Sequence, residues 1–159
     1  MRSQIMVDLD VAYVPTPKDI VRQMLQLASL RRGESLFDLG AGDGRIIIEA
    51  VRRFGARAVG VEIDPERISR IRERLNATKT QAELIEANLF HVDLSSADVI
   101  AIYLSDSANA KLAPKLRSEL KVGARVVSLD YALPGWVPER ELEVNTSGIT
   151  RKLYLYRIT

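Results

Sequence analysis

The sequence predicts an α/β fold in which a mostly parallel sheet, with one antiparallel strand, is covered by helices on both faces. Three observations indicate this fold. Strand patterns alternate with helix patterns along the chain, a glycine-rich turn joins an early strand to a helix, and the chain ends in a hairpin pattern. The 159 residues suit a single domain, with a lead-in and first helix over 1–30 and the core over 31–159.

The lead-in segment Tyr13–Pro17 cannot be helical, because its two prolines force the residues before them toward extended geometry. Thr16 and Pro17 fit the N-cap and the first position of a helix, and Asp19 completes a variant of the capping box. We expect this helix to run to about Leu30.

The most informative stretch is 35–45, where a buried strand leads into a turn with glycine at every second position. Ser35–Leu39 is mostly apolar, and Gly40, Gly42 and Gly44 follow, which lets the backbone bend sharply and approach a ligand closely. The apolar residues after the turn have helical spacing over 46–54. The N-terminus of that helix should face a bound cofactor, and a merely structural glycine turn is the alternative.

The turn does not match two common nucleotide-binding patterns. A dinucleotide fingerprint has a small residue where this chain has Arg45, and a Walker loop needs Gly-Lys-Ser/Thr after the turn. A second apolar strand carries Glu62 near its end, where doubly wound folds place the carboxylate that binds ribose hydroxyls. The turn and the acid together suit an adenosyl group without a pyrophosphate.

The remaining elements are predicted from the same kinds of pattern. We expect, in chain order, a strand over 57–62, a helix over 65–76, an edge strand over 81–87, a strand over 97–104, a helix over 109–120 with a break or restart at Pro114, a strand over 124–129, and a hairpin of 141–146 and 149–158. Because the carboxyl ends of parallel strands meet at one edge, Asn88, Tyr103 and Ser105 should gather beside the glycine turn. Asn88 could hold an adenine or form a turn.

Composition excludes several classes of function. The chain has no cysteine and one histidine, His91, which excludes thiol catalysis and histidine-rich metal sites. The net charge of +2 allows a nucleic-acid partner without indicating one, and the arginines over 67–74 read as the solvated face of a helix. No apolar run approaches the roughly 20 residues of a membrane span, and residues 1–10 lack the apolar core of a signal peptide. We therefore expect a cytoplasmic protein without membrane association.

Two segments together resemble a known superfamily. Asp38–Arg45 and Gly60–Ile63 resemble motif I and its partner acid in class I S-adenosylmethionine (AdoMet) methyltransferases. Further segments resemble the small archaeal protein-lysine methyltransferases, which are relatives of the mitochondrial lysine methyltransferases and, more distantly, of histone methyltransferases: Tyr13–Pro17, Asn88–Phe90, Arg125–Ser128, Gly135–Trp136 and Leu153–Tyr156. This resemblance implies a Rossmann-like class I methyltransferase fold with about seven strands, the last inserted beside the fifth.

The resemblance also implies a cofactor and the residues that bind it. AdoMet, which becomes S-adenosyl-L-homocysteine (AdoHcy), would lie on the glycine turn, with Asp38 and Asp43 attracting its ammonium and Glu62 holding its ribose. The expected cofactor-binding residues are Tyr13, Thr16, Asp38, Gly40, Ala41, Gly42, Asp43, Gly44, Glu62, Ile63, Asn88 and Leu89.

Methyl transfer from a sulfonium to an amine is an in-line displacement that mainly needs alignment, so a site without histidine, cysteine or metal is sufficient. The target lysine must arrive neutral, which an apolar channel favours. We expect this channel to contain Tyr13, Tyr103, Leu104 and Trp136, although Trp136 could equally be a core residue. Ser105 could accept a hydrogen bond from the amine, and Asp130 could take up the proton or only cap the strand end.

The connection between Asp130 and Glu141 is short and leaves the expected site open, which suits a side chain on a larger protein. The resulting prediction is an AdoMet-dependent protein-lysine N-methyltransferase that acts as a monomer on proteins with exposed lysines. An RNA methyltransferase and an AdoMet-binding regulatory protein without turnover are the alternatives.

Overall fold

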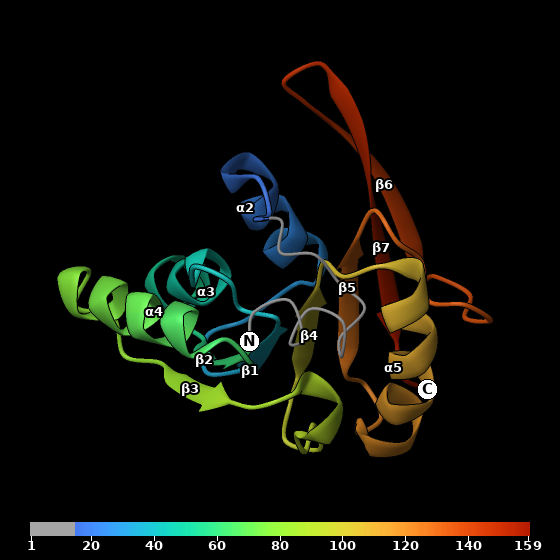
Figure 1. Cartoon of the computed structure of the whole chain (residues 1–159). Coiled ribbons are helices and arrows are strands. Elements are labelled where there is room, and N and C mark those ends of the chain that lie inside the picture. Colours follow the sequence, from blue (N-terminus) through green and yellow to red (C-terminus); the bar gives the residue numbers. More distant parts are fainter. Residues whose placement is uncertain (1–14) are drawn as a thin grey trace.

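The computed structural model describes residues 15–159, and its centre is a seven-stranded sheet with the order β3-β2-β1-β4-β5-β7-β6 (Figure 1). β1 to β5 run parallel, and β7 lies antiparallel between β5 and β6. The expected sheet, with the last strand inserted beside the fifth, is therefore confirmed. The strands are β1 (Ser35–Leu39), β2 (Arg57–Glu62), β3 (Glu83–Glu86), β4 (Val99–Ile102), β5 (Arg125–Leu129), β6 (Arg140–Thr146) and β7 (Ile149–Arg157).

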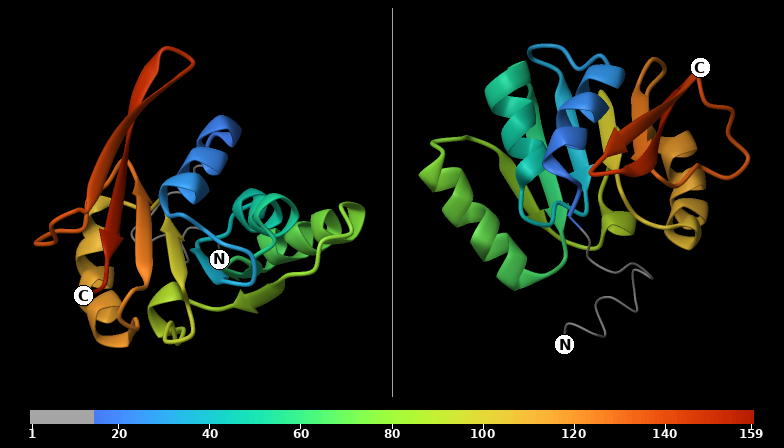
Figure 2. Two further views of the ribbon diagram at one scale, coloured as in Figure 1. Left: turned by 180° about the vertical axis from the view of Figure 1, so that it is seen from behind. Right: turned by 90° about the horizontal axis from the view of Figure 1, so that it is seen from above.

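Helices cover both faces of the sheet, as Figures 1 and 2 show. One face carries α2 (Lys18–Leu27), α3 (Arg45–Phe54) and α4 (Pro65–Ala77), and the other carries the short 3-10 helix η1 (Leu89–His91) and α5 (Asp106–Glu119). Neighbouring strand residues point to opposite faces, so Leu36 packs in the first core and Phe37 in the second. None of the helices within residues 15–159 is long and apolar enough to cross a membrane.

The start of α2 differs from the expected capping box. Pro17 is the N-cap and makes no side-chain cap, and the helix ends at Leu27 rather than near Leu30. Asp19, the expected partner of Thr16, instead accepts a hydrogen bond from the Thr146 hydroxyl of β6. The Asp19 carboxylate, which the local pattern placed in the helix cap, therefore bonds to a residue distant in sequence instead.

Two expectations for α5 are also wrong. The helix begins at Asp106 rather than 109, because the Ser105 side chain caps it by accepting a hydrogen bond from the Ala108 backbone N–H at 3.1 Å. It then continues through Pro114 without a break. Proline removes one helical hydrogen bond, but Pro114 is exposed while Leu112 and Leu116 anchor the opposite side in the core.

The hairpin of β6 and β7 extends past the carboxyl end of the parallel strands. Leu129, the last residue of β5, pairs with Leu153, so residues 149–152 continue beyond it (Figure 1). The hairpin therefore forms a wall at the edge of the sheet where the glycine turn also lies.

Candidate functional site

The glycine turn after β1 is held by backbone hydrogen bonds to the neighbouring strand. Gly40 and Ala41 both donate to the Val61 carbonyl at 2.8 Å, and Gly44 donates to the Ala41 carbonyl at 2.8 Å. Gly44 has φ +83° as the N-cap of α3, and a Cβ there would lie 2.9 Å from Ile71 Cγ2. A side chain at this position is therefore disfavoured by both conformation and space.

Glu62, at the end of β2, is bonded to the turn. It is 4% exposed, and its Oε1 accepts the Gly42 backbone N–H at 2.9 Å while its Oε2 accepts the Asp64 N–H at 3.0 Å. Arg67 Nη1 lies 3.7 Å from Oε2. The turn and the acid, predicted from separate patterns, thus face each other, and a carboxylate retains further acceptor positions for a ligand.

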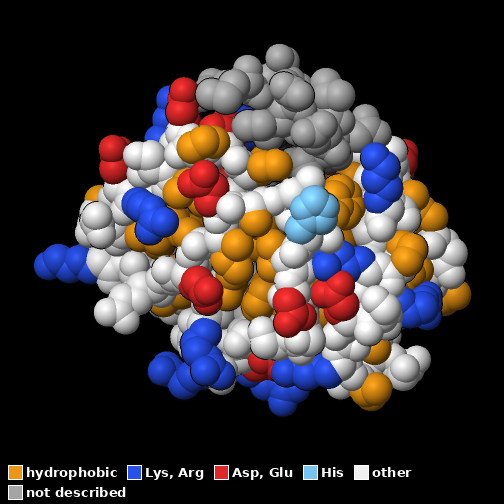
Figure 3. Space-filling model, turned by 60° about the horizontal axis from the view of Figure 1, so that its bottom comes forward, with side chains coloured by type: hydrophobic (Ala, Val, Ile, Leu, Met, Phe, Trp, Pro, Cys, Tyr) orange, Lys and Arg blue, Asp and Glu red, His pale blue; other side chains and the backbone are white. Residues whose placement is uncertain are grey.

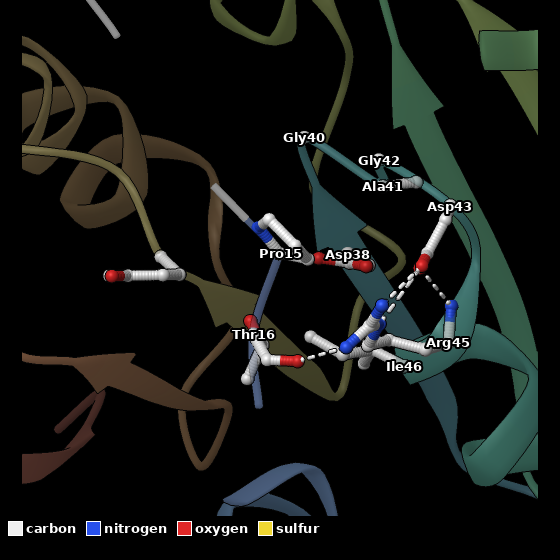
Figure 4. Close-up of a pocket in the computed structure, with 10 residues that line it drawn as sticks. Pro15, Thr16, Asp38, Gly40, Ala41, Gly42, Asp43, Arg45 and Ile46 are labelled. Carbon is white, nitrogen blue, oxygen red and sulfur yellow. Dashed lines mark hydrogen bonds and ion pairs between the residues drawn. The ribbon is translucent and has the colours of Figure 1, made fainter. Parts of the chain in front are cut away.

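A pocket opens beside the turn (Figure 4). It brings together the N-terminal segment, the turn and the end of β4, and it is lined by Pro15, Thr16, Asp38, Gly40, Ala41, Gly42, Asp43, Arg45, Ile46 and Tyr103. Asp38, Gly40, Ala41, Gly42, Asp43 and Thr16 were all expected here. Tyr13, expected beside them, lies outside the described residues.

Asp38 is the most deeply buried acid that lines this pocket. It is 3% exposed, and no donor within residues 15–159 makes a hydrogen bond to its carboxylate. Burial raises the pKa of Asp38 well above its ordinary value, and the nearby carboxylates of Glu62 and Asp43 raise it further. A bound cation would relieve this penalty, so Asp38 is suited to receive an ammonium group.

Asp43, the second acid of the turn, is already paired. Arg45 Nη2 lies 2.5 Å from its Oδ2 and Arg74 Nη1 lies 3.1 Å from the same atom, and Arg45 Nη1 also donates to the Thr16 carbonyl at 2.7 Å. Burial alone would raise the pKa of Asp43, but the hydrogen bonds from Arg45 and the charge of Arg74 outweigh it and lower the pKa. Asp43 therefore fastens the turn to the N-terminal segment, and its expected role toward an ammonium gains no support.

Two arginines of α4 were read from the sequence as solvent-facing but reach the site. Arg74 donates to the Asp43 carbonyl at 2.9 Å, and Arg67 lies near Glu62 and Asp64. Arg70 and Arg72 are exposed, as expected. The missed signal is the spacing of seven between Arg67 and Arg74, which places both on one side of a helix.

A second cluster lies next to the pocket, at the ends of β4, β5 and β7. Arg151 Nη2 donates to the Tyr103 hydroxyl at 2.9 Å and to Asp130 Oδ2 at 2.6 Å, and Arg151 Nε lies 3.1 and 2.9 Å from the two Asp130 oxygens. The ring of Tyr131 stacks on Tyr103 with centroids 6.3 Å apart. Burial raises the pKa of Tyr103, and the charge of Arg151 offsets part of that rise. Arg151 was not predicted.

Three residues considered for the substrate channel have partners within the fold. The Ser105 hydroxyl caps α5, and Asp130 is engaged by Arg151. Trp136 lies edge-on against Tyr156, 5.7 Å away, with the Arg117 guanidinium 4.4 Å from its ring. Because Tyr156 pairs with Val126 near the start of β5, Trp136 packs in the second core and we no longer place it in a channel. Leu104 does lie beside the turn, 3.6 Å from where a Cβ on Gly40 would be.

The residues expected after the second and third strands do not line this pocket. Asn88 Oδ1 accepts the Phe90 N–H at 2.9 Å and caps η1, which is the turn-forming alternative, while Leu89 is buried in the core. Ile63 follows Glu62 and is half-buried, and His91 is exposed. Of these, only Ile63 keeps a partly accessible side chain next to Glu62.

Comparisons with known proteins agree with this geometry. Residues 38–140 match the model of the ANTKMT methyltransferase domain. A protein-lysine N-methyltransferase of Saccharolobus islandicus is 42% identical over 93% of this chain and 94% of its own length. A mouse adenine nucleotide translocase lysine N-methyltransferase is 35% identical over 82% of this chain, and this chain spans 57% of it.

A solved structure gives a similar result. An RNA methyltransferase from Salinibacter ruber in complex with AdoHcy is 41% identical, covers 91% of this chain and 94% of its own, and superposes with a TM-score of 0.85. The turn and the acid at the end of the parallel strands agree with these matches. The chain belongs to the ANTKMT methyltransferase domain family.

Proposed function

We propose that this protein transfers the methyl group of AdoMet to the side-chain amine of lysine in other proteins. The observation that carries the proposal is the pocket in which the glycine turn and the buried Asp38 meet Tyr103, with Glu62 bonded to the turn through Gly42. The relatives support the choice of acceptor, because the Saccharolobus and animal proteins are lysine methyltransferases.

The residues of the pocket suit AdoMet. The carboxylate of Asp38 is buried and accepts no hydrogen bond from residues 15–159, so it would hold the ammonium of the methionine portion. Glu62 would accept the ribose hydroxyls, and the backbone of Gly40 and Gly42 would lie against the methionine portion. When bound, AdoMet supplies a methyl group on a sulfonium, whose S–C bond breaks with its electron pair passing to sulfur as the amine nitrogen forms the new N–C bond.

Alignment is the main task of the protein in this reaction. Holding two reactants in line supplies on the order of 7–11 kcal/mol, more than one acid or base usually contributes. The turn is fixed by Val61 and Glu62. Tyr103, bonded to Arg151, and Leu104, beside Gly40, would form the acceptor side. Ser105 and Asp130 have other partners, so we assign neither a proton-transfer role; the lysine gives its proton to solvent water as it enters the pocket.

Protein is favoured over RNA as the acceptor despite the likeness to the Salinibacter RNA methyltransferase. RNA binding needs cationic side chains available to phosphates. Around this pocket Arg45, Arg74 and Arg151 are each paired with a carboxylate. On the face shown in Figure 3, basic side chains are scattered among acidic ones and do not form one continuous patch.

Methyl-labelled AdoMet added to the protein and a cell lysate tests the proposal. We expect label in protein and, by mass spectrometry, on lysine, with no label when Asp38→Asn replaces the wild type. Label in RNA would establish the alternative acceptor. Binding of AdoMet without any transfer would indicate a regulatory protein. The cytoplasmic location, the monomeric state and the single-domain division stay predictions.

A further inference from the structure

Arg151 joins three strands at the acceptor side of the pocket. It lies in β7, its guanidinium forms a two-point contact with Asp130 after β5, and its Nη2 also reaches the Tyr103 hydroxyl after β4. Its side chain is 15% exposed, so the contacts are shielded from water. A planar guanidinium held at two points has a fixed direction, and this direction determines where Tyr103 is held.

The backbone conformation of Asp130 directs its carboxylate toward Arg151. Asp130 has φ +65°, a left-handed conformation that is uncommon outside glycine, and its N–H donates to the Lys152 carbonyl at 2.7 Å. The chain thus turns at the end of β5 so that the carboxylate meets Arg151. Without Arg151, a carboxylate would stand beside Tyr103, which lines the pocket.

A free carboxylate at this place would oppose the reaction proposed above. Lysine has an ordinary pKa of about 10.4, and a nearby negative charge favours its ammonium form. The ammonium has no lone pair and cannot attack a methyl group. The pair of Asp130 and Arg151 carries no net charge, so it lacks this effect.

We propose, resting on the proposed function, that Arg151 is a positioning residue that fixes the Tyr103 hydroxyl at the pocket wall and cancels the charge of Asp130, so that the acceptor lysine is held neutral. Other titratable groups also lie near this pair. Within residues 15–159, Tyr131 stacks on Tyr103, the exposed Lys152 bonds through its backbone to Asp130, and Asp38 and the Asp43–Arg45 pair line the pocket.

The test compares pH profiles of methyl transfer to the acceptor protein found by the labelling experiment. In Arg151→Met, the rising limb of the kcat–pH profile should move to higher pH by about one unit. At pH 7, kcat should therefore fall about tenfold. Binding of the unmethylated acceptor in the presence of AdoHcy, measured by calorimetry, should become about tenfold tighter, because Asp130 then pairs with the lysine ammonium. A purely structural loss would weaken binding.

Two variants separate charge from folding. The double variant Asp130→Asn with Arg151→Met removes both charges and should restore the wild-type pH limb, and Arg151→Lys should keep that limb because it keeps the charge. Arg157→Met is the matched control, since Arg157 lies in the same strand and pairs with Glu139 at 3.2 Å on the surface. It should leave the profile unchanged.

The outcomes separate a failure of this inference from a failure of the proposed lysine methyltransferase activity. If the wild type methylates lysine and Arg151→Met binds AdoMet normally but keeps the wild-type pH limb, the role of Arg151 is refuted while the function stands. An equal shift in Arg157→Met refutes it also. If the wild type transfers no methyl group to lysine, the proposed function itself fails. If Arg151→Met does not fold, Asp130→Asn alone tests the inference. The rising limb of its kcat–pH profile should move to lower pH.

Discussion

The backbone N–H of Gly42 donates to Glu62 Oε1 at 2.9 Å, so the acid expected to hold a ribose also holds the glycine turn. The same carboxylate accepts the Asp64 N–H at 3.0 Å, at the N-cap of α4. One side chain thus sets the relative position of the turn after β1 and the helix after β2. Removing it affects both ligand binding and the shape of the pocket.

Glu62→Ala should lower AdoMet affinity on the order of 100-fold, because it removes charge-assisted acceptors and leaves the Gly42 and Asp64 N–H groups buried without partners. The same loss should decrease the free energy of unfolding by about 2 kcal/mol. Calorimetry and thermal melts measure the two effects. Glu62→Gln retains an acceptor oxygen and should lose less of both; unchanged AdoMet binding in Glu62→Ala would refute the ribose assignment.

Asp38 predicts a pH-dependent affinity. Because the pKa of Asp38 in the free protein is raised by burial and by the carboxylates of Glu62 and Asp43, part of the population is protonated at pH values where aspartate is normally ionised. A bound ammonium favours the ionised form, so binding should release protons and tighten as pH rises toward the raised pKa, then level off. Calorimetry in two buffers of different ionisation enthalpy measures this release.

Asp38→Asn is the control for that measurement. It should bind AdoMet more weakly and without proton release. In the free wild type, the raised pKa means that the folded state holds its proton more tightly than the unfolded state, so stability should fall as pH rises from the ordinary aspartate range through the raised pKa. This slope should be absent from the variant, and its persistence would assign it to another group.

Gly44 and Gly33 form a matched pair for testing the turn. Their φ angles are +83° and +82°, but a Cβ on Gly44 would lie 2.9 Å from Ile71 Cγ2, whereas nothing lies within 4 Å at Gly33. Gly33→Ala should destabilise the protein by about 1 kcal/mol through backbone conformation alone. Gly44→Ala should destabilise it by about 2–3 kcal/mol and also weaken AdoMet binding. Equal melting temperatures would contradict the crowding at Ile71.

Arg125 predicts a stability effect far from the pocket. It is 3% exposed, forms an ion pair with Glu34 at 2.8 Å, and donates to the Ala28 and Ser29 carbonyls at 3.0 Å. Arg125→Met should lower the free energy of unfolding by about 3 kcal/mol, since it leaves Glu34 and two carbonyls without their donor. Chemical denaturation measures this. AdoMet affinity should change little.

The pair of Arg125 and Glu34 also predicts how the free energy of unfolding depends on pH in the acid range. The hydrogen bond from Arg125 is the largest influence on Glu34, and it outweighs burial to lower the pKa of that carboxyl. The stabilisation is present above the ordinary glutamate pKa and is lost as pH falls through the lowered pKa. Arg125→Met should therefore show a flatter fall in stability over this window. A wild-type slope in the variant would refute the linkage.

The parts of the site that the sequence predicted are those set by local pattern. The strand before Gly40, the turn itself and the acid at Glu62 are encoded in short stretches, and parallel strands bring them together. The parts that were missed depend on partners far along the chain. Arg151 meets Tyr103 from 48 residues away, and Asp130 adopts a left-handed conformation without the glycine that would have marked it.

Local signals were also overridden where a distant partner was better placed. Asp19 leaves its expected capping position for Thr146, and Trp136, for which the sequence left channel and core equally open, packs against Tyr156. Pattern alone could not rank these competing contacts, because each joins residues that are far apart in the sequence.

The placement of β7 between β5 and β6 has a consequence for the order in which the sheet can be completed during translation. Each of its two neighbours is synthesised before it, so the β5 edge must stay open until residues 149–157 leave the ribosome and enter the gap. Arg151 arrives with that final strand. A nascent chain can therefore form the glycine turn early, but the contacts of Arg151 with Asp130 and Tyr103 form only after the hairpin has paired with β5.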